Sequence, residues 1–409
     1  MNYRSPLSLR RCACRRLRLP ALPAGLGLLM LILTACLEPG NPTAFYQPPT
    51  PLPDGPPGTL LRVEPLRTAP AGAQGWRILY RSTNVGDQPI AVSGVVFVPD
   101  GAAPAEGRPV VAWAHATTGV ARRCAPSLRP AALATRIPGL DTFLAAGAVV
   151  VATDYPGLGT PGPHPFLIGE SEARAVIDSV RAARELDDAE AGASFAVWGH
   201  SQGGQAGLFA GQIVESYAPE LSLVGVAAAA PASELAELLH HDVATLEGRV
   251  LAALAFVALS EIIPEASLTR LASTRVARQM RALARGCVET TPEGLAEVVG
   301  GITLGLTFLE VAPTRTEPWR SILATNTPSG DLGGVPLLLV QGESDSIVRP
   351  VVSERFAQTA CRRGTPVLLR LYPGQSHTTI AHHAAADVAA WIADRFAAQP
   401  APSSCTDLR

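Results

Sequence analysis

The most informative segment of this 409-residue chain is Phe195-Ala196-Val197-Trp198-Gly199-His200-Ser201-Gln202-Gly203-Gly204. It begins as an apolar run typical of a buried strand, and a helical pattern follows at once, from Gln202 to Tyr217. A strand that passes through Gly-x-Ser-x-Gly directly into a helix is typical of a nucleophile elbow. We therefore expect Ser201 to have a strained backbone at the tight turn, and Gly199 and Gly203 to let neighbouring segments approach closely.

A serine nucleophile needs a histidine base and an acid that orients the base. Asp345 lies just after a later apolar run, where a carboxylate can reach the end of the sheet, and Glu343 is the competing acid. His377 lies on a loop after the last apolar run, as a mobile base should. We expect Ser201, Asp345 and His377 to form a catalytic triad, in the chain order Ser, acid, His.

Two backbone N–H groups are expected to bind the oxyanion that forms in such a reaction. The first is that of Gln202, because this residue follows the nucleophile and stands at a helix N-terminus. The second is that of Thr117, with Ala116 as the alternative, in the loop His115–Gly119 after an early apolar run. The other histidines are weaker candidates for the base, and we interpret them as structural, capping or surface residues: His115, His164, His200, His240, His241, His382 and His383.

Apolar runs and helical patterns alternate along most of the chain. Two β-rich runs, Trp76–Ser82 and Ile90–Val98, flank a turn signal at Gly86-Asp87 and predict an antiparallel hairpin. Runs typical of buried strands follow at Val110–Ala114, Ala148–Ala152, Phe195–Trp198, Leu223–Ala229, Leu337–Val340 and Val367–Leu371. Helical patterns lie at Glu170–Leu186, Gln202–Tyr217 and Ala384–Ala397. The alternation predicts an α/β fold, with a mostly parallel central sheet flanked by helices and a hairpin at one edge.

One long region interrupts this alternation. From about Ala232 to Asp331 the chain has helical runs without a convincing strand, and Val250–Ile263 and Ile302–Val311 are strongly apolar. A segment of this length between two strands is too large for a loop. We therefore expect a core at residues 61–231 and 332–409, with a helical cap at 232–331 inserted over the C-terminal edge of the sheet. Structural bulk without a role in the site is the alternative.

The first 35 residues have the pattern of an export signal. Six arginines and no acidic residue precede the apolar run Leu19–Leu33, which prolines and glycines interrupt and which is too short for a membrane span. The run ends in Leu33-Thr34-Ala35-Cys36, which resembles a bacterial lipobox, so we expect cleavage after residue 35 and lipidation of Cys36. An ordinary signal peptide is the alternative. Leu37 rather than Asp follows Cys36, which favours the outer membrane. Residues 36–60 are rich in Pro and Gly and predict a tether.

Charge and cysteine content narrow the function further. The net charge of −2 provides no basic surface for nucleic acid, and loss of the signal would make the chain more acidic. Two of the seven cysteines lie in the predicted signal, and Cys36 is the predicted site of lipidation. The sequence has no CxxC spacing that would indicate a metal site. Four cysteines remain, an even number that suits an exported protein and allows three pairings. We favour Cys361–Cys405, which would tie down the C-terminal tail, and Cys124–Cys287.

Five segments then carry a family resemblance: His115–Gly119, Asp154–Gly159, Gly199–Gly204, Gly342–Asp345 and Pro373–His377. In this order they resemble the secretory lipase family of α/β-hydrolases, which includes fungal lipase A-type enzymes. The resemblance implies the α/β-hydrolase fold, serine-type hydrolysis of carboxylic esters without a metal or cofactor, and a cap that shapes an acyl pocket. It implies a structural role near the site for Asp154 and Tyr155. The chain departs from the common pattern at Ala116, where Gly is usual.

These observations together predict a lipase or a medium-to-long-chain esterase. Its partners would be a small-molecule ester or lipid and, through the N-terminal lipid anchor, a membrane. A short-chain esterase or a peptidase on the same fold is the first alternative, although no acidic pair for a peptide N-terminus is evident. A non-catalytic lipoprotein that binds an apolar ligand is the second.

Overall fold

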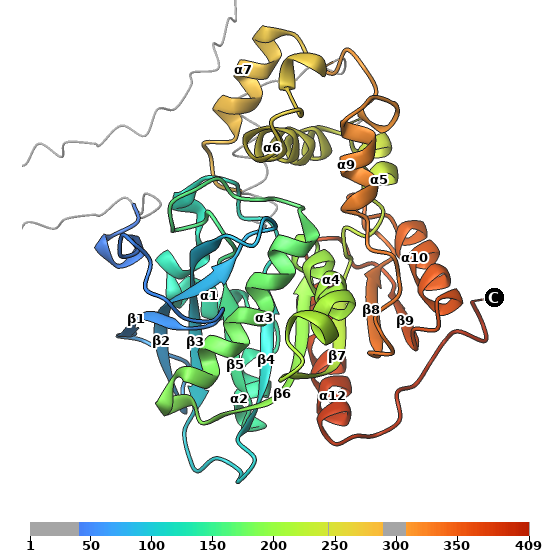
Figure 1. Ribbon diagram of the computed structural model, residues 1–409. Helices are drawn as coiled ribbons and strands as arrows, with labels where there is room; N and C mark the ends of the chain where they lie inside the picture. Colours follow the sequence, from blue (N-terminus) through green and yellow to red (C-terminus); the bar gives the residue numbers. More distant parts are fainter. Residues whose placement is uncertain (1–40, 244, 289–307, 409) are drawn as a thin grey trace, which may run out of the picture. The chain divides into compact units, whose positions relative to one another are not determined.

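A single sheet forms the centre of the molecule. The computed structural model describes residues 41–408, apart from residue 244 and residues 289–307. In that part of the chain nine strands pair in the order β1-β2-β3-β5-β4-β6-β7-β8-β9 (Figure 1). The strands are β1 (Leu60–Pro65), β2 (Ala73–Thr83), β3 (Pro89–Pro99), β4 (Arg108–Ala114), β5 (Val149–Thr153), β6 (Ala191–His200), β7 (Ser222–Ala229), β8 (Leu337–Gly342) and β9 (Val367–Tyr372).

The sheet is parallel except at one edge. Strands β4 to β9 pair with one another in parallel. Strands β1, β2 and β3 are antiparallel, and β3 joins the rest by an antiparallel pairing with β5. The predicted hairpin and the predicted α/β fold are thus confirmed. Strand β1 was not predicted, because none of its side chains is fully buried and its sequence lacks an alternating apolar pattern.

Helices connect the strands and cover the sheet. The α-helices are α1 (Pro130–Arg136), α2 (Leu140–Ala145), α3 (Gly169–Glu185), α4 (Gln202–Tyr217), α5 (Leu235–Asp242), α6 (Leu246–Ile262), α7 (Thr274–Leu283), α9 (Trp319–Thr325), α10 (Pro350–Arg362), α11 (Ile380–His383) and α12 (Ala385–Phe396). Short 3-10 helices are η1 (Ala44–Tyr46), η2 (Arg122–Cys124), η3 (Pro126–Leu128), η4 (Asp187–Ala189), η5 (Leu268–Arg270) and η6 (Pro313–Arg315).

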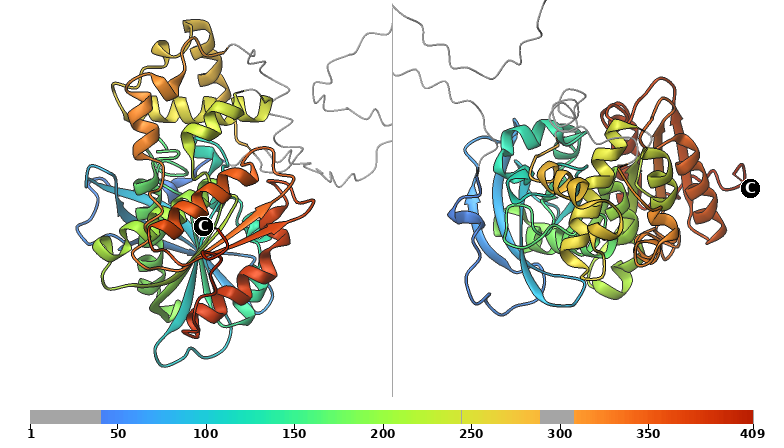
Figure 2. Two further views of the ribbon diagram at one scale, coloured as in Figure 1. Left: turned by 90° about the vertical axis from the view of Figure 1, so that its right-hand side faces the viewer. Right: turned by 90° about the horizontal axis from the view of Figure 1, so that it is seen from above.

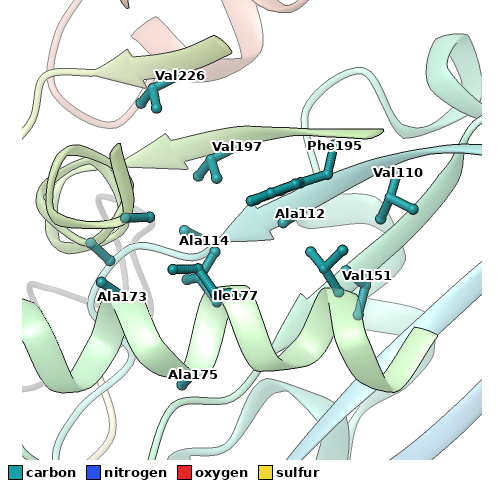
Figure 3. Packing of buried hydrophobic residues seen from close by; sticks show 14 of the residues in the cluster. Val110, Ala112, Ala114, Val151, Ala173, Ala175, Ile177, Phe195, Val197 and Val226 are labelled. Atoms are coloured by element: carbon teal, nitrogen blue, oxygen red, sulfur yellow. The ribbon is translucent and has the colours of Figure 1, made fainter. Parts of the chain in front are cut away.

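Alternation along the strands divides the apolar side chains between the two faces of the sheet. Val110 and Ala112 of β4 belong to the core under α3 and α4, whereas Val111 and Trp113 belong to the core under α2 and α12. Figure 3 shows Ile177 of α3 directed toward the sheet, next to Ala114 of β4. Because both faces are covered, the strands read as nearly continuous apolar runs, which is why they could be predicted.

Helices α5, α6, α7 and α9 lie between β7 and β8 in the chain, in the region where a helical cap was expected. They enclose an apolar core of their own, in which Trp319 of α9 packs edge-on against Phe256 of α6 with ring centroids 5.2 Å apart. Figures 1 and 2 show α6 and α7 stacked beyond one end of the sheet. The predicted apolar run Ile302–Val311 lies mostly outside the described residues.

Part of the segment predicted as a tether, around Ala44–Tyr46, is fixed to the folded core. The Tyr46 side chain is buried, and its hydroxyl is hydrogen-bonded to that of Ser127 at 2.8 Å. Arg62 donates hydrogen bonds to the backbone oxygens of Ala44 and Phe45. These long-range contacts fix a segment that has no periodicity of its own. The predicted signal peptide and Cys36 lie outside the described residues. Within the described residues, no helix combines the length and apolar character needed to cross a membrane.

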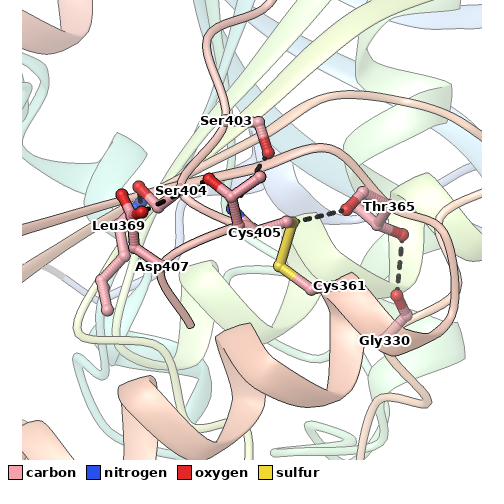
Figure 4. Close-up of a disulfide and its surroundings, with 9 residues drawn as sticks. Gly330, Cys361, Thr365, Leu369, Ser403, Ser404, Cys405 and Asp407 are labelled. Atoms are coloured by element: carbon pink, nitrogen blue, oxygen red, sulfur yellow. Dashed lines mark hydrogen bonds between the residues drawn. A yellow bond between two sulfur atoms is a disulfide. The ribbon is translucent and has the colours of Figure 1, made fainter. Parts of the chain in front are cut away.

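Both disulfide pairings favoured by the sequence are present. Cys361 of α10 is bonded to Cys405, and backbone pairing of Ser404 with Val367 at 2.7 Å holds the same tail along β9 (Figure 4). Cys124 is bonded to Cys287, which follows α7. The second disulfide therefore joins the loop after β4 to the helical region.

Candidate active site

Ser201 occupies the turn between β6 and α4. Its φ of 56° and ψ of −114° lie in a region that side-chain-bearing residues rarely adopt, as expected for a nucleophile elbow. A Cβ atom on Gly199 would overlap the carbonyl oxygen of Gly203, and one on Gly203 would overlap that of Ala114. The two glycines therefore permit the close approach of strand, turn and helix that the sequence predicted.

The three predicted triad residues meet at this turn. The Ser201 Oγ lies 2.9 Å from His377 Nε2, and His377 Nδ1 lies 2.8 Å from Asp345 Oδ2. A carboxylate only accepts hydrogen bonds, so His377 Nδ1 carries a hydrogen and donates a hydrogen bond to Asp345. Nε2 is then the nitrogen that faces the Ser201 hydroxyl and can accept its hydrogen bond. The side chains are thus arranged for removal of a proton from Ser201.

Asp345 is fixed by donors on both of its oxygens. The backbone N–H groups of Ile347 and Val348 donate to Oδ1, each at 2.8 Å, and Gln341 Nε2 donates to Oδ2 at 3.3 Å. These donors hold the Asp345 side chain in place toward His377. The competing acid, Glu343, is exposed to solvent. The geometry therefore favours Asp345.

His200 supports the loop of His377, a role that the sequence analysis did not assign. Its Nε2–H donates to the backbone oxygen of His377 at 2.9 Å, and the two rings lie 4.9 Å apart. Burial, and the nearby positive charge that His377 can carry, lower the pKa of His200 to about 3. The ring is therefore neutral, and it can donate through Nε2 without adding a charge beside the base. The signal in the sequence was its position directly before Ser201.

The expected oxyanion residues lie on the same cavity as Ser201. Thr117 and Gln202 both line this cavity, whereas Ala116 lines a neighbouring one. This distribution favours Thr117 over the alternative. The loop His115–Gly119 is fixed by Tyr155, whose hydroxyl donates a hydrogen bond to the backbone oxygen of His115 at 3.1 Å. Burial lowers the pKa of His115 to about 4, which suits its expected structural role.

The cavity at Ser201 is apolar and is formed largely by the helical region. About 710 Å³ of empty space lies between its lining residues, a figure that includes open solvent at its mouth. Its apolar lining comes from α5, α6, α9 and three loops: Phe166, Leu167, Ala232, Leu235, Leu238, Leu239, Leu251, Ala252, Ala255, Phe256, Leu259, Ile322, Leu323, Ile347 and Val348. No charged side chain is among the lining residues of the described chain. The space next to Ser201 is therefore lined almost entirely by apolar side chains.

Sequence comparisons show to which known proteins this chain is related. A family model described as secretory lipase matches residues 137–404. The chain is 29% identical to a probable inactive lipase of Mycobacterium tuberculosis, over 87% of this chain and 82% of that protein. It is 25% identical to a secreted triacylglycerol lipase of Malassezia globosa, over 86% of this chain and 78% of that protein.

Solved structures share the fold. The X-ray structure of Candida antarctica lipase A matches with a TM-score of 0.73 at 21% identity, over 90% of this chain and 94% of that chain. The structure of the rice cell wall degrading esterase LipA from Xanthomonas oryzae matches with a TM-score of 0.68 at 22% identity, over 84% of this chain and 98% of that chain. These likenesses establish the α/β-hydrolase fold.

Proposed function

This chain belongs to the secretory lipase family, and from that premise we propose that it is a serine hydrolase of carboxylic esters. The observation that carries the proposal is the continuous hydrogen-bonded series Ser201, His377 and Asp345, of which Ser201 lines an apolar cavity. The preferred substrates are esters of medium-to-long-chain acids, as for a lipase.

The proposed reaction is acyl transfer in two steps. Ser201 Oγ bonds to the ester carbonyl carbon while His377 Nε2 takes the hydroxyl proton and Asp345 stabilises the resulting imidazolium. The backbone N–H groups of Gln202 and Thr117 bind the oxyanion, each worth about 2.7–4 kcal/mol. The carbon–oxygen bond to the alcohol then breaks, and His377 returns the proton to that oxygen. Water, deprotonated by His377, releases the acid from Ser201 by the same sequence of steps.

The apolar cavity supports a preference for longer acyl chains. Each methylene that moves from water into such a cavity contributes about 0.8 kcal/mol, or roughly a fourfold gain in kcat/KM when the contact is made in the transition state. Hydrolysis of p-nitrophenyl esters from acetate to palmitate tests this, with the chain from Leu37 onward and Ser201→Ala as the control. Activity that rises with chain length and vanishes in Ser201→Ala supports the proposal. Activity on acetate and butyrate alone indicates a short-chain esterase.

A non-catalytic role is the second candidate, because one relative is described as a probable inactive lipase. In that case the apolar cavity would bind a ligand without cleaving it. The complete hydrogen-bonded series from Ser201 to Asp345 argues for activity in this chain. Absence of hydrolysis on every ester, with no labelling of Ser201 by a fluorophosphonate, would favour the binding role.

Export and lipid anchoring complete the proposal. The family is described as secretory, and the Malassezia globosa relative is described as secreted, which supports export. We propose further that Cys36 is lipidated and holds the protein on the bacterial envelope, with the outer membrane preferred. Cys36→Ser tests the anchor: the wild-type chain should sediment with membranes and the variant should not. Equal sedimentation of both would contradict lipidation.

A further inference from the structure

A buried polar cluster behind the nucleophile elbow takes no part in the proposed proton transfers. It consists of Glu172 on α3, His164 on the preceding loop and Gln202 at the start of α4, and each is at most 1% exposed. Burial of three such side chains in one place is costly unless hydrogen bonds are made, and the bonds that Glu172 Oε1, Gln202 Nε2 and His164 make leave Glu172 Oε2 and Gln202 Oε1 without a partner. Their position next to Ser201 suggests a role in shaping the site.

Both amide hydrogens of Gln202 are held within this cluster. Gln202 Nε2 donates to Glu172 Oε1 at 2.7 Å and to His164 Nε2 at 3.1 Å. His164 can accept there because its Nδ1–H donates to the backbone oxygen of Pro156 at 2.8 Å. Burial lowers the pKa of His164 to about 3, so the ring stays neutral. One orientation of Gln202 is thereby fixed.

The same carboxyl group also supports the cavity wall. Glu172 Oε1 accepts a hydrogen bond from the backbone N–H of Leu167 at 3.0 Å. Leu167 lines the cavity at Ser201 and has a φ of 61°, a conformation that is strained for a residue with a side chain. Glu172 therefore connects a cavity-wall residue to the residue expected to supply an oxyanion donor.

We propose that Glu172 is a positioning residue that holds Gln202 so that its backbone N–H faces the oxyanion. This inference rests on the proposed function. Ionisation of Glu172 would place a negative charge beside the developing oxyanion and oppose the reaction.

The surroundings keep the acid neutral at neutral pH. Burial raises the pKa of Glu172 to about 8, against the favourable hydrogen bonds from Gln202 and Leu167. The titratable groups that face it are His164 and Tyr155, with His115 beyond His164. Both histidines are neutral, because burial lowers the pKa of each, and Tyr155 is neutral, because burial raises its pKa. Above pH 8 the acid loses its proton, so the oxyanion becomes harder to form.

The test is the pH dependence of kcat on p-nitrophenyl butyrate, with active sites counted by fluorophosphonate titration. In wild type, kcat should fall about tenfold between pH 7.5 and pH 10, and return when the pH is restored. Glu172→Gln mimics the neutral acid, so it should keep kcat at pH 7.5 within about threefold and lose the alkaline fall. Glu172→Ala should lower kcat about tenfold at pH 7.5 with little change in KM.

Asp178→Asn is the matched control. Asp178 is a buried acid on the same helix that accepts hydrogen bonds from Ser82 and Tyr217, away from the elbow. Its variant should keep the alkaline fall. Identical pH profiles for wild type and Glu172→Gln, or a wild-type kcat that stays level to pH 10, would overturn the inference. If Ser201-dependent hydrolysis is itself absent, the proposed function fails first and this inference with it.

Discussion

Removal of the Cys124–Cys287 disulfide should damage catalysis far more than removal of the other disulfide. This bond joins the helical region to the loop that carries Thr117, an expected oxyanion residue. Beside it, the backbone N–H of Val288 donates to the backbone oxygen of Thr118 at 2.9 Å. The disulfide therefore clamps the segment next to Thr117, whereas Cys361–Cys405 ties down a tail remote from Ser201.

The two bonds are nevertheless similar in their expected contribution to stability. Cys124 and Cys287 are 163 residues apart in sequence, and Cys361 and Cys405 are 44 apart. The chain-entropy relation then gives losses of about 5 and about 4 kcal/mol in the free energy of unfolding. Loss of one oxyanion donor lowers kcat roughly 100-fold or more, so a more mobile Thr117 should lower kcat about tenfold or more. Stability alone would not separate the two bonds, and kcat should.

The assay is steady-state hydrolysis of a p-nitrophenyl ester by C124S/C287S and C361S/C405S. The temperature is one at which circular dichroism shows both variants folded. We expect kcat to fall about tenfold or more in C124S/C287S and to stay within about twofold of wild type in C361S/C405S. An equal loss in both variants, or an unchanged kcat in C124S/C287S, would refute the reasoning.

Three further predictions follow from the site. Asp345→Asn offers an amide where His377 needs a carboxylate, so kcat should fall by about 10⁴ with little change in Tm, as measured by kinetics and calorimetry. Ala255→Phe fills part of the cavity, so kcat/KM for palmitate should fall about tenfold or more relative to butyrate in a chain-length series. Burial raises the pKa of Glu172 from 4.5 to about 8, so the folded chain keeps a proton that the unfolded chain releases, and stability falls as pH rises between these values. The Tm of Glu172→Gln should therefore rise relative to wild type from pH 5 to pH 8, and a constant difference would contradict the shift.

Much of the fold and site could be predicted because the relevant signals are local. Strand β5 is buried along its whole length, so its sequence is a continuous apolar run. The glycines around Ser201 indicate the nucleophile elbow. Asp345 and His377 each follow a strand, so topology alone brings them to one edge of the sheet. The structure places both within hydrogen-bond distance of their expected neighbours.

The features that were missed depend on contacts between distant segments. Tyr46 docks against Ser127, 81 residues away, so its Pro-rich surroundings read as a tether. Glu172 reads as an ordinary acid in the first turn of α3, and its partners His164 and Gln202 lie on other segments. A signal was present, because Glu172 lies four residues before Val176 on the apolar stripe of the helix. A charged residue on such a stripe indicates a buried polar contact.

The central claim is that Ser201 is the nucleophile of an ester hydrolase. It is tested most directly by mass spectrometry of the chain after treatment with a fluorophosphonate, with hydrolysis measured on the same samples. We predict one adduct per chain, located on Ser201, and loss of hydrolysis in proportion to labelling. Hydrolysis that persists after complete labelling, or an adduct on another residue with Ser201→Ala still active, would contradict the account.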